Sequence, residues 1–584
     1  MKKNVISIVI DSVSYNSVFT KNGIPTPMPF LKSLLSNSVW AEKMYSQGPY
    51  TDAAMKALYT GSNVLDDYGY FYRLNKAKNN HFSFFKNNGY ETYGIFYPYY
   101  MNGEKILNDI DHVHYNSCFL FSSESGGVFE YFLSLLKNGK LTAKEEELGV
   151  TRLELMFKIW IKYYEDILSD NQKSILIKNQ FNVNEVSKSL FLLNNEFELF
   201  KQDKSKYFRK FLLEKLDYFN QIDKVNVRGL IDSERINNVL FKDNKKFINY
   251  IDFKSFTNNV FRPDFGLKRF LKSVSLYLKS KDKYVFYYIK NYFECINCVK
   301  HFKKVFTDNH WQNMPSAKRQ LDFAAEEINS RKEQNRPYYY SVHLLDPHEY
   351  ISFFSYDIND NDVLRAEIND LFEYVKTIPN KFHGSLIYYL SLRYVDSCLK
   401  SFFEKIDLSN VTVLITADHG TSFSYDVLHG PKVNNFNEEC YHVPCLIFNK
   451  HFNQKKIDSF CSSKSILPTL AKLSNLDYST FKCKPFDETR DNFVLTEYNG
   501  PGCPDFISKE FWLSARDDNY IVGRKIKLSD SLEDAKIAEV YNLNDDKNGL
   551  FNVAKKIKYE KIEYLDKKII SRFLEIRRNI GQNG

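Results

Sequence analysis

Continuous apolar runs that end abruptly in polar residues are the main structural signal of this chain. Residues 5–10 and 411–416 are two such runs, rich in β-branched residues, and residues 338–345 form a third that also contains tyrosines. Runs of this length and composition are typical of strands that are buried on both faces of a parallel sheet. We therefore predict a central sheet that contains all three. The residues that end the runs are Asp11-Ser12, Asp418-His419-Gly420 and Asp346-Pro347-His348.

Segments with helical periodicity and further short strands occupy the intervals between these runs. Pro in a first helical turn and Gly after a last turn mark helix ends, and Gly61 ends one helix in this way. Pro468 lies inside another predicted helix, which is an uncommon arrangement. The alternation predicts an α/β fold with a mixed, mostly parallel sheet between helices. The predicted helices cover residues 27–35, 53–60, 384–405 and 463–473, and the further strands cover residues 38–44, 91–97 and 445–448.

The hydrophobic pattern changes in residues 123–333. Gly and Pro become scarce there, and apolar residues recur at helical spacing, as in residues 153–168. We predict a mainly helical insertion whose aromatic stripes form its core, with a lid or a membrane-docking face as the alternative. The last hundred residues combine strand-like segments with a charged terminal helix. The predicted organisation is an α/β domain in two parts, residues 1–122 and 334–480, around an insertion at 123–333, with a small antiparallel C-terminal subdomain at 481–584.

Composition and charge exclude some classes of protein. The net charge of +8 is modest for 584 residues, and the lysines are spread along the chain, which argues against nucleic acid as a partner. The nine cysteines are scattered and do not resemble a secreted disulfide framework. Cys295 and Cys298 form a single C-x-x-C pair, for which a structural role is favoured over a metal site. The sequence contains no run of about 18 apolar residues, so we predict no membrane-spanning helix. We therefore expect a cytoplasmic protein.

Residues with metal-ligand or nucleophile chemistry stand where several predicted strands end. Asp11, Asp418 and His419 follow strands, and Thr51 stands at the start of the helix that ends at Gly61. Each of these positions, taken alone, is explained as well by a capped turn or a helix N-cap. Their joint placement favours a functional site, because a parallel sheet brings the carboxyl ends of its strands to one edge. His348 follows the predicted strand at 338–345, and His429 follows the Asp418-His419 segment.

These residue types together predict metal-assisted phosphoryl chemistry. A divalent cation on Asp11, Asp418 and His419 would contact the Thr51 oxygen and lower the pKa of that hydroxyl. The Thr51 oxygen would then attack phosphorus and form a phospho-threonine, which water or an alcohol would release. His348 would bind phosphate oxygens or protonate the leaving group. We also assign His429 and Lys432 to substrate binding, with His429 as a second candidate for proton transfer.

The order of these motifs resembles that of the alkaline phosphatase/sulfatase superfamily. The resemblance covers roughly residues 4–115 and 338–560, leaves the helical segment between them out, and implies the superfamily's fold. Thr51 stands as far before Thr60-Gly61 as the sulfatase nucleophile does before its own Thr-Gly. The resemblance rests on the motifs IVIDS at 8–12, TPMPFLKSL at 26–34, DPHEY at 346–350, DLSNVTVLITADHG at 407–420, VPCLIF at 443–448, SILPTL at 465–470 and VYNLNDDKNGLFNVA at 540–554.

The departures from the sulfatase pattern are equally informative. Thr51 replaces the Cys or Ser that sulfatases oxidise to formylglycine, no Pro-Ser-Arg follows it, and Ser12 replaces the second acid. A Thr nucleophile with Asp-His on the later strand is similar to lipoteichoic acid synthases and phosphoethanolamine transferases. That resemblance implies a phospho-threonine intermediate around manganese or zinc, with Mg²⁺ or Ca²⁺ as alternative ions. It also implies Asp11, Thr51, Asp418 and His419 as metal site and nucleophile, and His348 and His429 as substrate or second-metal residues.

The resemblance implies three functions in descending order of preference. The first is a phosphotransferase that moves phosphoglycerol or phosphoethanolamine from a phosphate-ester donor to a glycan or lipid, as in the synthesis of cell-surface polysaccharide. The second is a hydrolase of phosphodiesters, phosphonates or sulfate esters. The third is a binding protein that keeps the fold without catalysis. Contact with a membrane, if the donor is a lipid, would be peripheral and would use the insertion.

Overall fold

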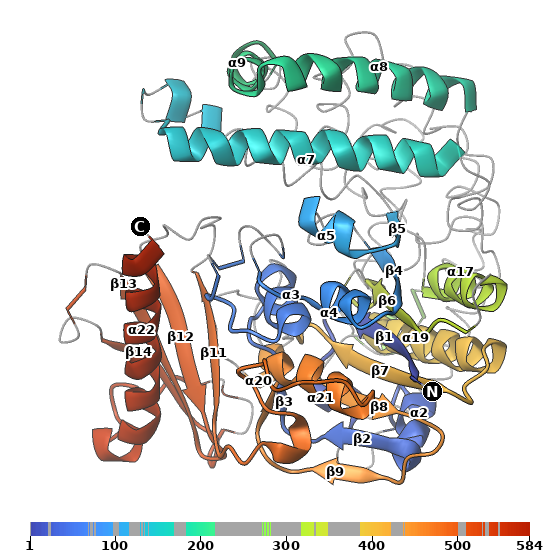
Figure 1. The fold of residues 1–584 in the computed structure, drawn as a ribbon. Helices are drawn as coiled ribbons and strands as arrows, with labels where there is room; N and C mark the ends of the chain where they lie inside the picture. Colours follow the sequence, from blue (N-terminus) through green and yellow to red (C-terminus); the bar gives the residue numbers. More distant parts are fainter. Residues whose placement is uncertain are drawn as a thin grey trace.

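A computed structural model describes most of the two outer parts of the chain and a portion of the region between them. It describes residues 2–20, 25–96, 104–115, 129–168, 183–215, 317–348, 386–421 and 436–583, with short gaps inside several of these ranges, and scattered positions between 271 and 281. Figure 1 shows a central sheet with its helices, a separate C-terminal sheet to one side, and a group of long helices beyond the sheet edge that carries β5.

The central sheet has eight strands in the order β5-β4-β6-β1-β7-β8-β2-β9. The pairs from β5 to β7 are parallel, β8 runs antiparallel to both of its neighbours, and β9 is parallel to β2. The sheet is therefore mixed and mostly parallel, as predicted. Its strands are β1 (Asn4–Ile10), β2 (Ser38–Ala41), β4 (Glu91–Phe96), β5 (His112–Tyr115), β6 (Tyr338–Leu344), β7 (Val411–Ala417), β8 (Cys445–Phe448) and β9 (Lys455–Ile457).

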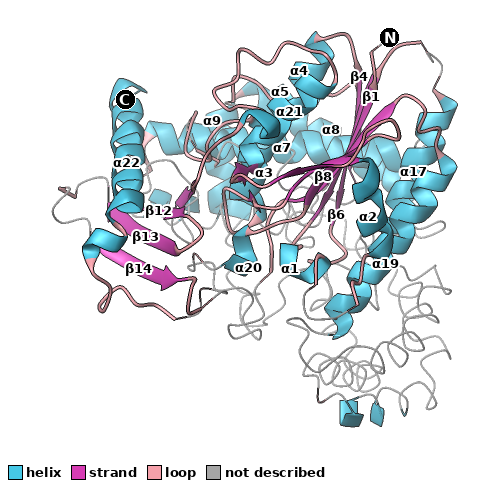
Figure 2. Cartoon of the chain, turned by 90° about the horizontal axis from the view of Figure 1, so that it is seen from below, coloured by secondary structure: helices cyan, strands magenta, loops and turns pink. Residues whose placement is uncertain are grey.

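Helices cover both faces of this sheet, which explains the continuous apolar runs. Figure 2 shows α3, α4 and α21 on one side of the strands and α2, α17 and α19 on the other. Strands β6 and β7 are buried along their whole length for this reason. The helices are α2 (Pro29–Ser33), α3 (Thr51–Thr60), α4 (His81–Asn87), α17 (Ala317–Ser330), α19 (Leu386–Lys405) and α21 (Ile466–Leu473), with the short α1 (Tyr15–Val18), α5 (Glu104–Asp109) and α20 (Glu438–Tyr441) between them.

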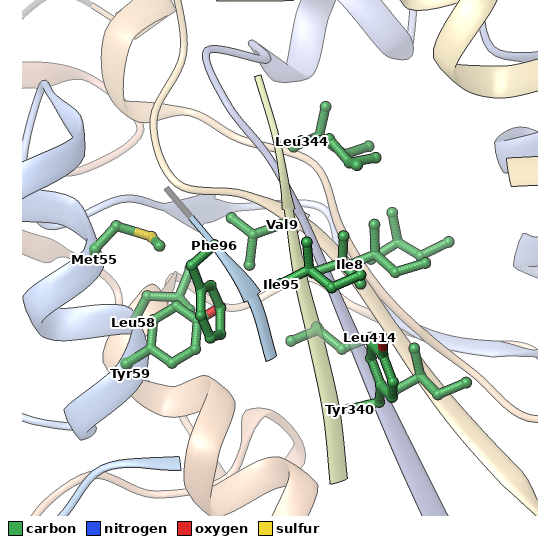
Figure 3. Packing of buried hydrophobic residues seen from close by; sticks show 14 of the residues in the cluster. Ile8, Val9, Met55, Leu58, Tyr59, Ile95, Phe96, Tyr340, Leu344 and Leu414 are labelled. Carbon is green, nitrogen blue, oxygen red and sulfur yellow. The ribbon is translucent and has the colours of Figure 1, made fainter. Parts of the chain in front are cut away.

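Helix α3 is held against the sheet by apolar side chains on one of its faces. Met55, Leu58 and Tyr59 lie on the same side of the sheet as Val9 and Phe96 (Figure 3), and all five are buried. Full burial of a side chain such as Leu58 contributes about 2 kcal/mol. The helix ends at Gly61, which adopts a left-handed conformation with φ 67° that glycine tolerates without strain. The N-terminus of α3 is thereby fixed relative to the carboxyl ends of the strands.

The C-terminal part forms a second, smaller sheet with the strand order β11-β12-β13-β14. All of its pairings are antiparallel. Helix α22 (Glu563–Asn583) packs beside it, and Figure 1 shows the pair on the side of the molecule away from α17 and α19. This agrees with the small antiparallel sheet and terminal helix that the sequence predicts. The strands are β11 (Val494–Asn499), β12 (Glu510–Arg516), β13 (Tyr520–Lys527) and β14 (Ile537–Asn542).

The described portion of residues 123–333 contains long amphipathic helices. Helices α7 (Ala143–Leu168), α8 (Val183–Gln202) and α9 (Lys204–Lys210) pack through aromatic side chains, with Phe157 in ring contact with Phe197 and Phe200. A short π-helical turn, Phe211–Lys215, follows α9. Helix α17, the last of this range, lies against the central sheet instead (Figure 2). Among the helices that the structure describes, none has the length and apolar character that a membrane span requires.

Two local predictions are changed by the structure. The strand predicted at 38–44 is two strands, β2 and β3 (Met44–Tyr45), and β3 pairs with β10 (Cys461–Ser462) outside the main sheet. Pro468 does not interrupt a helix: the segment 463–465 is a 3₁₀ turn, and α21 begins at Ile466, so Pro468 lies in the first α-helical turn. Proline is tolerated there because the N–H groups of a first turn have no partner within the helix.

Candidate functional site

The register of three adjacent strands brings their carboxyl ends to one point. Ile10 at the end of β1 pairs with Leu344 of β6 on one side and with Ala417 of β7 on the other. Asp11 therefore follows β1 at the level where Asp418 follows β7. Both residues are buried, with exposed fractions of 1% and 0%. Residues separated by about 400 positions thus form one edge of the central sheet.

Asp11, Asp418 and His419 form a buried cluster with the composition of a metal site. Their ligand atoms all lie within 4.8 Å of one another. The Nε2 atom of His419 is 3.5 Å from Asp11 Oδ1 and 3.6 Å from Asp418 Oδ2. Oxygen and imidazole ligands of this kind suit a divalent cation such as Mn²⁺ or Zn²⁺.

The hydrogen bonding of Asp418 is consistent with a cation at this cluster. Asp418 Oδ1 accepts hydrogen bonds from the backbone N–H groups of His419 and Ser12, whereas Asp418 Oδ2 accepts none from the residues that the structure describes. A buried carboxylate oxygen without a donor is costly. A bound cation would satisfy it, and Asp11, Asp418 and His419 are the side chains that would hold the ion.

The Thr51 hydroxyl lies directly beside this cluster. Its Oγ1 atom is 3.2 Å from Asp11 Oδ2 and 3.2 Å from His419 Nε2. Thr51 is the first residue of α3, and Tyr50 is the N-cap without a side-chain hydrogen bond to the helix. The N–H groups of the first turn and the dipole of the helix therefore lie at the same end of α3 as the hydroxyl, where they favour an anion such as phosphate. The structure thus brings together all four residues that we assigned to metal binding and nucleophilic attack.

Burial and neighbouring charges shift the pKa values of the two carboxyl groups in opposite directions. Burial raises the pKa of Asp11, but the imidazoles of His348, His419 and His343 outweigh this effect and lower it. Burial and the nearby Asp11 raise the pKa of Asp418 to about 6. Two carboxylates this close cannot both carry a charge cheaply without a cation, which agrees with the metal-binding interpretation.

His343 is a site residue that the sequence analysis did not single out. It lies inside β6, is fully buried, and places Nε2 at 3.5 Å from Asp11 Oδ2 and 4.0 Å from Asp418 Oδ2. Burial lowers its pKa to about 4, so its imidazole is neutral at pH 7 and can serve as a metal ligand or a hydrogen-bond donor. No local pattern in the sequence marks His343: only the register, which pairs it with Val9, places it on the same sheet face as Asp11, two residues further on.

The remaining predicted residues are placed differently. His348 is exposed, and the centroid of its ring lies 6.5 Å from that of His419 at an interplanar angle of 82°. It therefore stands at the rim of the site and not among the buried ligands. His429 and Lys432 lie outside the described residues.

Gly420 permits a close approach of two backbone segments behind the site. A Cβ atom at this position would lie 1.9 Å from the carbonyl oxygen of Glu439. The Gly420 N–H also donates to the carbonyl of Cys440 at 2.8 Å. The absence of a side chain at Gly420 is therefore what the packing requires.

A family comparison matches a segment of the chain that contains part of this site. A family model described as Sulfatase matches residues 239–476, which include Asp418 and His419 but neither Asp11 nor Thr51. The match begins within the predicted insertion, a segment that the resemblance of the motifs does not cover. No curated protein has a significantly similar sequence.

Solved structures share the fold over nearly the whole chain. A sulfatase candidate, yidJ from Bacteroides fragilis, is 12% identical with a TM-score of 0.50, and the likeness covers 99% of this chain and 96% of that one. The phosphonate monoester hydrolase of Agrobacterium radiobacter is 12% identical with a TM-score of 0.48, covering 99% and 96%. The lipoteichoic acid synthase LtaP from Listeria monocytogenes is 10% identical with a TM-score of 0.46, covering 99% and 91%.

At these identities the likeness is one of fold, and the two structures with TM-scores below 0.5 add no further argument. The family match and the motif order within a shared fold agree with each other. The Sulfatase model covers residues 239–476, less than half of the 584 residues, and the yidJ structure shares the fold. Both findings agree with the resemblance of the motifs to the alkaline phosphatase/sulfatase superfamily.

Proposed function

We propose that the protein is a metal-dependent phosphotransferase that uses Thr51 as its nucleophile and forms a phospho-threonine intermediate. The observation that carries this proposal is the position of Thr51 Oγ1, at 3.2 Å from both Asp11 Oδ2 and His419 Nε2 and at the N-terminus of α3. Members of the superfamily are hydrolytic enzymes that generally use a divalent metal. A divalent cation, when bound, lowers the pKa of the Thr51 hydroxyl and stabilises negative charge on the phosphoryl oxygens.

In the first step, the Thr51 oxygen attacks the phosphorus of a phosphate-ester donor. A bond forms between Thr51 Oγ1 and phosphorus, and the bond between phosphorus and the leaving alcohol oxygen breaks. The hydroxyl proton of Thr51 ends on the departing alcohol, so charge and atoms balance. His348, at the rim of the site, is placed to pass that proton. The N-terminus of α3 holds the phosphoryl oxygens during the attack.

In the second step, a hydroxyl group of the acceptor attacks the same phosphorus. The bond to Thr51 Oγ1 breaks, and the proton of the acceptor hydroxyl returns to Thr51. Phosphoglycerol or phosphoethanolamine moves in this way to a glycan or lipid acceptor, and water in place of the acceptor gives hydrolysis. The donor and acceptor classes rest on the resemblance to Thr-dependent transferases, since Thr51 excludes formylglycine chemistry.

Intact mass spectrometry tests this proposal directly. Metal-free protein is supplied with manganese and a bis(nitrophenyl) phosphate diester, quenched with acid and weighed. We expect a covalent adduct of one nitrophenyl phosphate on Thr51, absent without metal. Thr51→Ala should give no adduct and lower turnover by at least about a thousandfold, because removing a nucleophile removes the step it performs. Thr51→Ser keeps the hydroxyl and is the matched control, in which the adduct should form.

The Sulfatase family match supports one second candidate, the hydrolysis of sulfate esters. Nitrophenyl sulfate in the same assay distinguishes the two. Turnover of the sulfate ester without turnover of the diester, and without an adduct, would refute the phosphotransferase. An alcohol such as glycerol in the phosphodiester assay separates transfer from hydrolysis, because transfer yields a new phosphodiester of that alcohol.

A further inference from the structure

Ser12 has a strained backbone at the centre of the site. Its φ is +63°, in the left-handed region that residues other than glycine rarely occupy, and its side chain is buried. Strain of this kind persists only where surrounding contacts determine the conformation, and such positions cluster at functional sites. The resemblance assigns this position to a second acid, so Ser12 adds no charge to the cluster.

One residue here donates hydrogen bonds to both carboxyl groups of the metal cluster. The Ser12 backbone N–H donates to Asp418 Oδ1 at 3.2 Å, and the Ser12 hydroxyl donates to Asp11 Oδ1 at 2.8 Å. Asp11 Oδ1 also lies 3.5 Å from His419 Nε2, and Asp11 Oδ2 accepts from Thr51. Asp418 Oδ2 lies 3.6 Å from His419 Nε2. Ser12 therefore helps to fix the orientation of both carboxylates at the edge where the ion would bind.

The left-handed conformation makes this double contact feasible. In a continued strand, successive side chains point to opposite faces, so the Ser12 side chain would point away from that of Asp11. The turn at Ser12 brings its hydroxyl back to the carboxylate of Asp11. The strain is thus explained by the contacts that it allows.

Two other elements hold Ser12 in this conformation through its carbonyl group. The Tyr388 hydroxyl of α19 donates to the Ser12 carbonyl at 2.9 Å, and the Thr421 hydroxyl, shortly after β7, donates to it at 2.9 Å. Both donors come from segments distant in sequence. The conformation is therefore set by the tertiary structure and not by the local sequence.

We propose that Ser12 is a positioning residue that orients the carboxylates of Asp11 and Asp418 for a divalent cation before the ion arrives. This inference rests on the proposed function only in requiring a bound ion, and not on the identity of the substrate. Hydrogen-bond partners of metal ligands fix ligand orientation, and their removal typically lowers metal affinity by about 10- to 100-fold.

Metal titration of the full-length protein tests this role without any substrate. Isothermal titration calorimetry with manganese chloride, and separately with zinc chloride, is performed on metal-free wild type and variants. We expect Ser12→Ala and Ser12→Gly to bind about 10- to 100-fold more weakly than wild type. Tyr388→Phe, which removes one of the two groups that hold the turn, should weaken binding by a smaller factor.

Thermal unfolding of the metal-free variants separates positioning from folding. Glycine adopts a positive φ without strain, so Ser12→Gly should melt at or above the wild-type temperature although it binds the ion weakly. Ser12→Asn should recover part of the affinity, because Asn tolerates the left-handed region and its amide can donate to Asp11. Ser38→Ala is the matched control: it removes a buried hydroxyl that donates to the Leu34 carbonyl, and should leave the affinity for the ion unchanged.

The outcomes decide between the roles. If Ser12→Gly binds manganese and zinc within twofold of wild type, Ser12 is only a turn residue and the proposal is overturned. The same conclusion follows if wild type binds neither ion. If wild type binds manganese and the series falls as expected, the proposal stands even when the mass assay finds no phospho-threonine, and only the proposed function then fails.

Discussion

Buried acids at two places in the described part of the chain are compensated in different ways. Between the C-terminal sheet and α22, Arg572 donates to Glu497 at 2.7 Å and to Asp66 at 2.8 Å, and Arg524 donates to Asp566 at 2.5 and 2.8 Å. Each of these acids has an arginine from the chain itself. Buried carboxylates with such a partner form a complete structural unit.

At the carboxyl edge of the central sheet, the acids have no such partner. The salt bridges of Asp11 and Asp418 within the described residues are to histidines alone, and one of these, His343, has a pKa lowered to about 4 and is neutral at pH 7. The difference indicates that burial of acids alone does not identify a function. A cluster that the chain neutralises by itself is structural, whereas a cluster that still needs positive charge is suited to an ion from solution.

The largest effect is expected when the metal cluster loses one charge. Asp418→Asn keeps an oxygen that accepts from the backbone N–H groups of Ser12 and His419 but removes the negative charge. We expect catalytic turnover to fall by at least about a thousandfold, because metal affinity and activation of Thr51 are both lost. The metal-free protein should melt at the wild-type temperature or higher, because burial and Asp11 raise the pKa of Asp418 to about 6 and its charge is therefore unfavourable in the metal-free fold. A lower melting temperature would contradict this interpretation.

At the structural cluster we expect the reverse: a loss of stability with no change in metal affinity. Arg572→Met leaves Glu497 and Asp66 buried without their cation and should lower the free energy of unfolding by about 3–5 kcal/mol. Chemical denaturation of metal-free protein measures this loss. Manganese affinity, determined by calorimetry on the folded variant, should stay within about twofold of wild type, because no residue of this cluster touches the site. A large change in affinity would remove the distinction between the two clusters.

The smallest effect is a pH dependence that only the metal cluster should show. The pKa of Asp418 in the fold, about 6, lies above the ordinary value of 3.8. The metal-free fold therefore gains stability from this group as the pH falls from above 6 toward 4 and loses it as the pH rises. A cation requires the deprotonated carboxylate, so the rise in melting temperature on adding manganese should shrink as the pH falls through 6.

Thermal melts from pH 5 to pH 8, with and without manganese, measure this dependence. Asp418→Asn is the control, since it removes the titrating group. If the manganese-induced shift in wild type were constant across this range, the assignment of Asp418 as a ligand would be contradicted.

Much of the architecture followed from local patterns of the sequence. The apolar runs at 5–10 and 411–416 predicted strands with their ends nearly correct, and these strands are adjacent in the sheet. The run at 38–44 was misjudged because the pairing partner of each half lies far along the chain, and β3 joins a different sheet from β2. A strand is defined by its partners, which the sequence period does not identify.

The sequence by itself determined which residue types end the buried strands, and from these the grouping of Asp11, Thr51, Asp418 and His419 could be inferred, because parallel strands end at a common edge. Only the tertiary structure decided that His343 lies beside Asp11 and that Ser12 turns back toward both carboxylates. The register of β6 against β1 decides the first, and the hydroxyl groups of Tyr388 and Thr421 hold the second. Neither contact leaves a local trace in the sequence, since each depends on segments that meet only after the chain has folded.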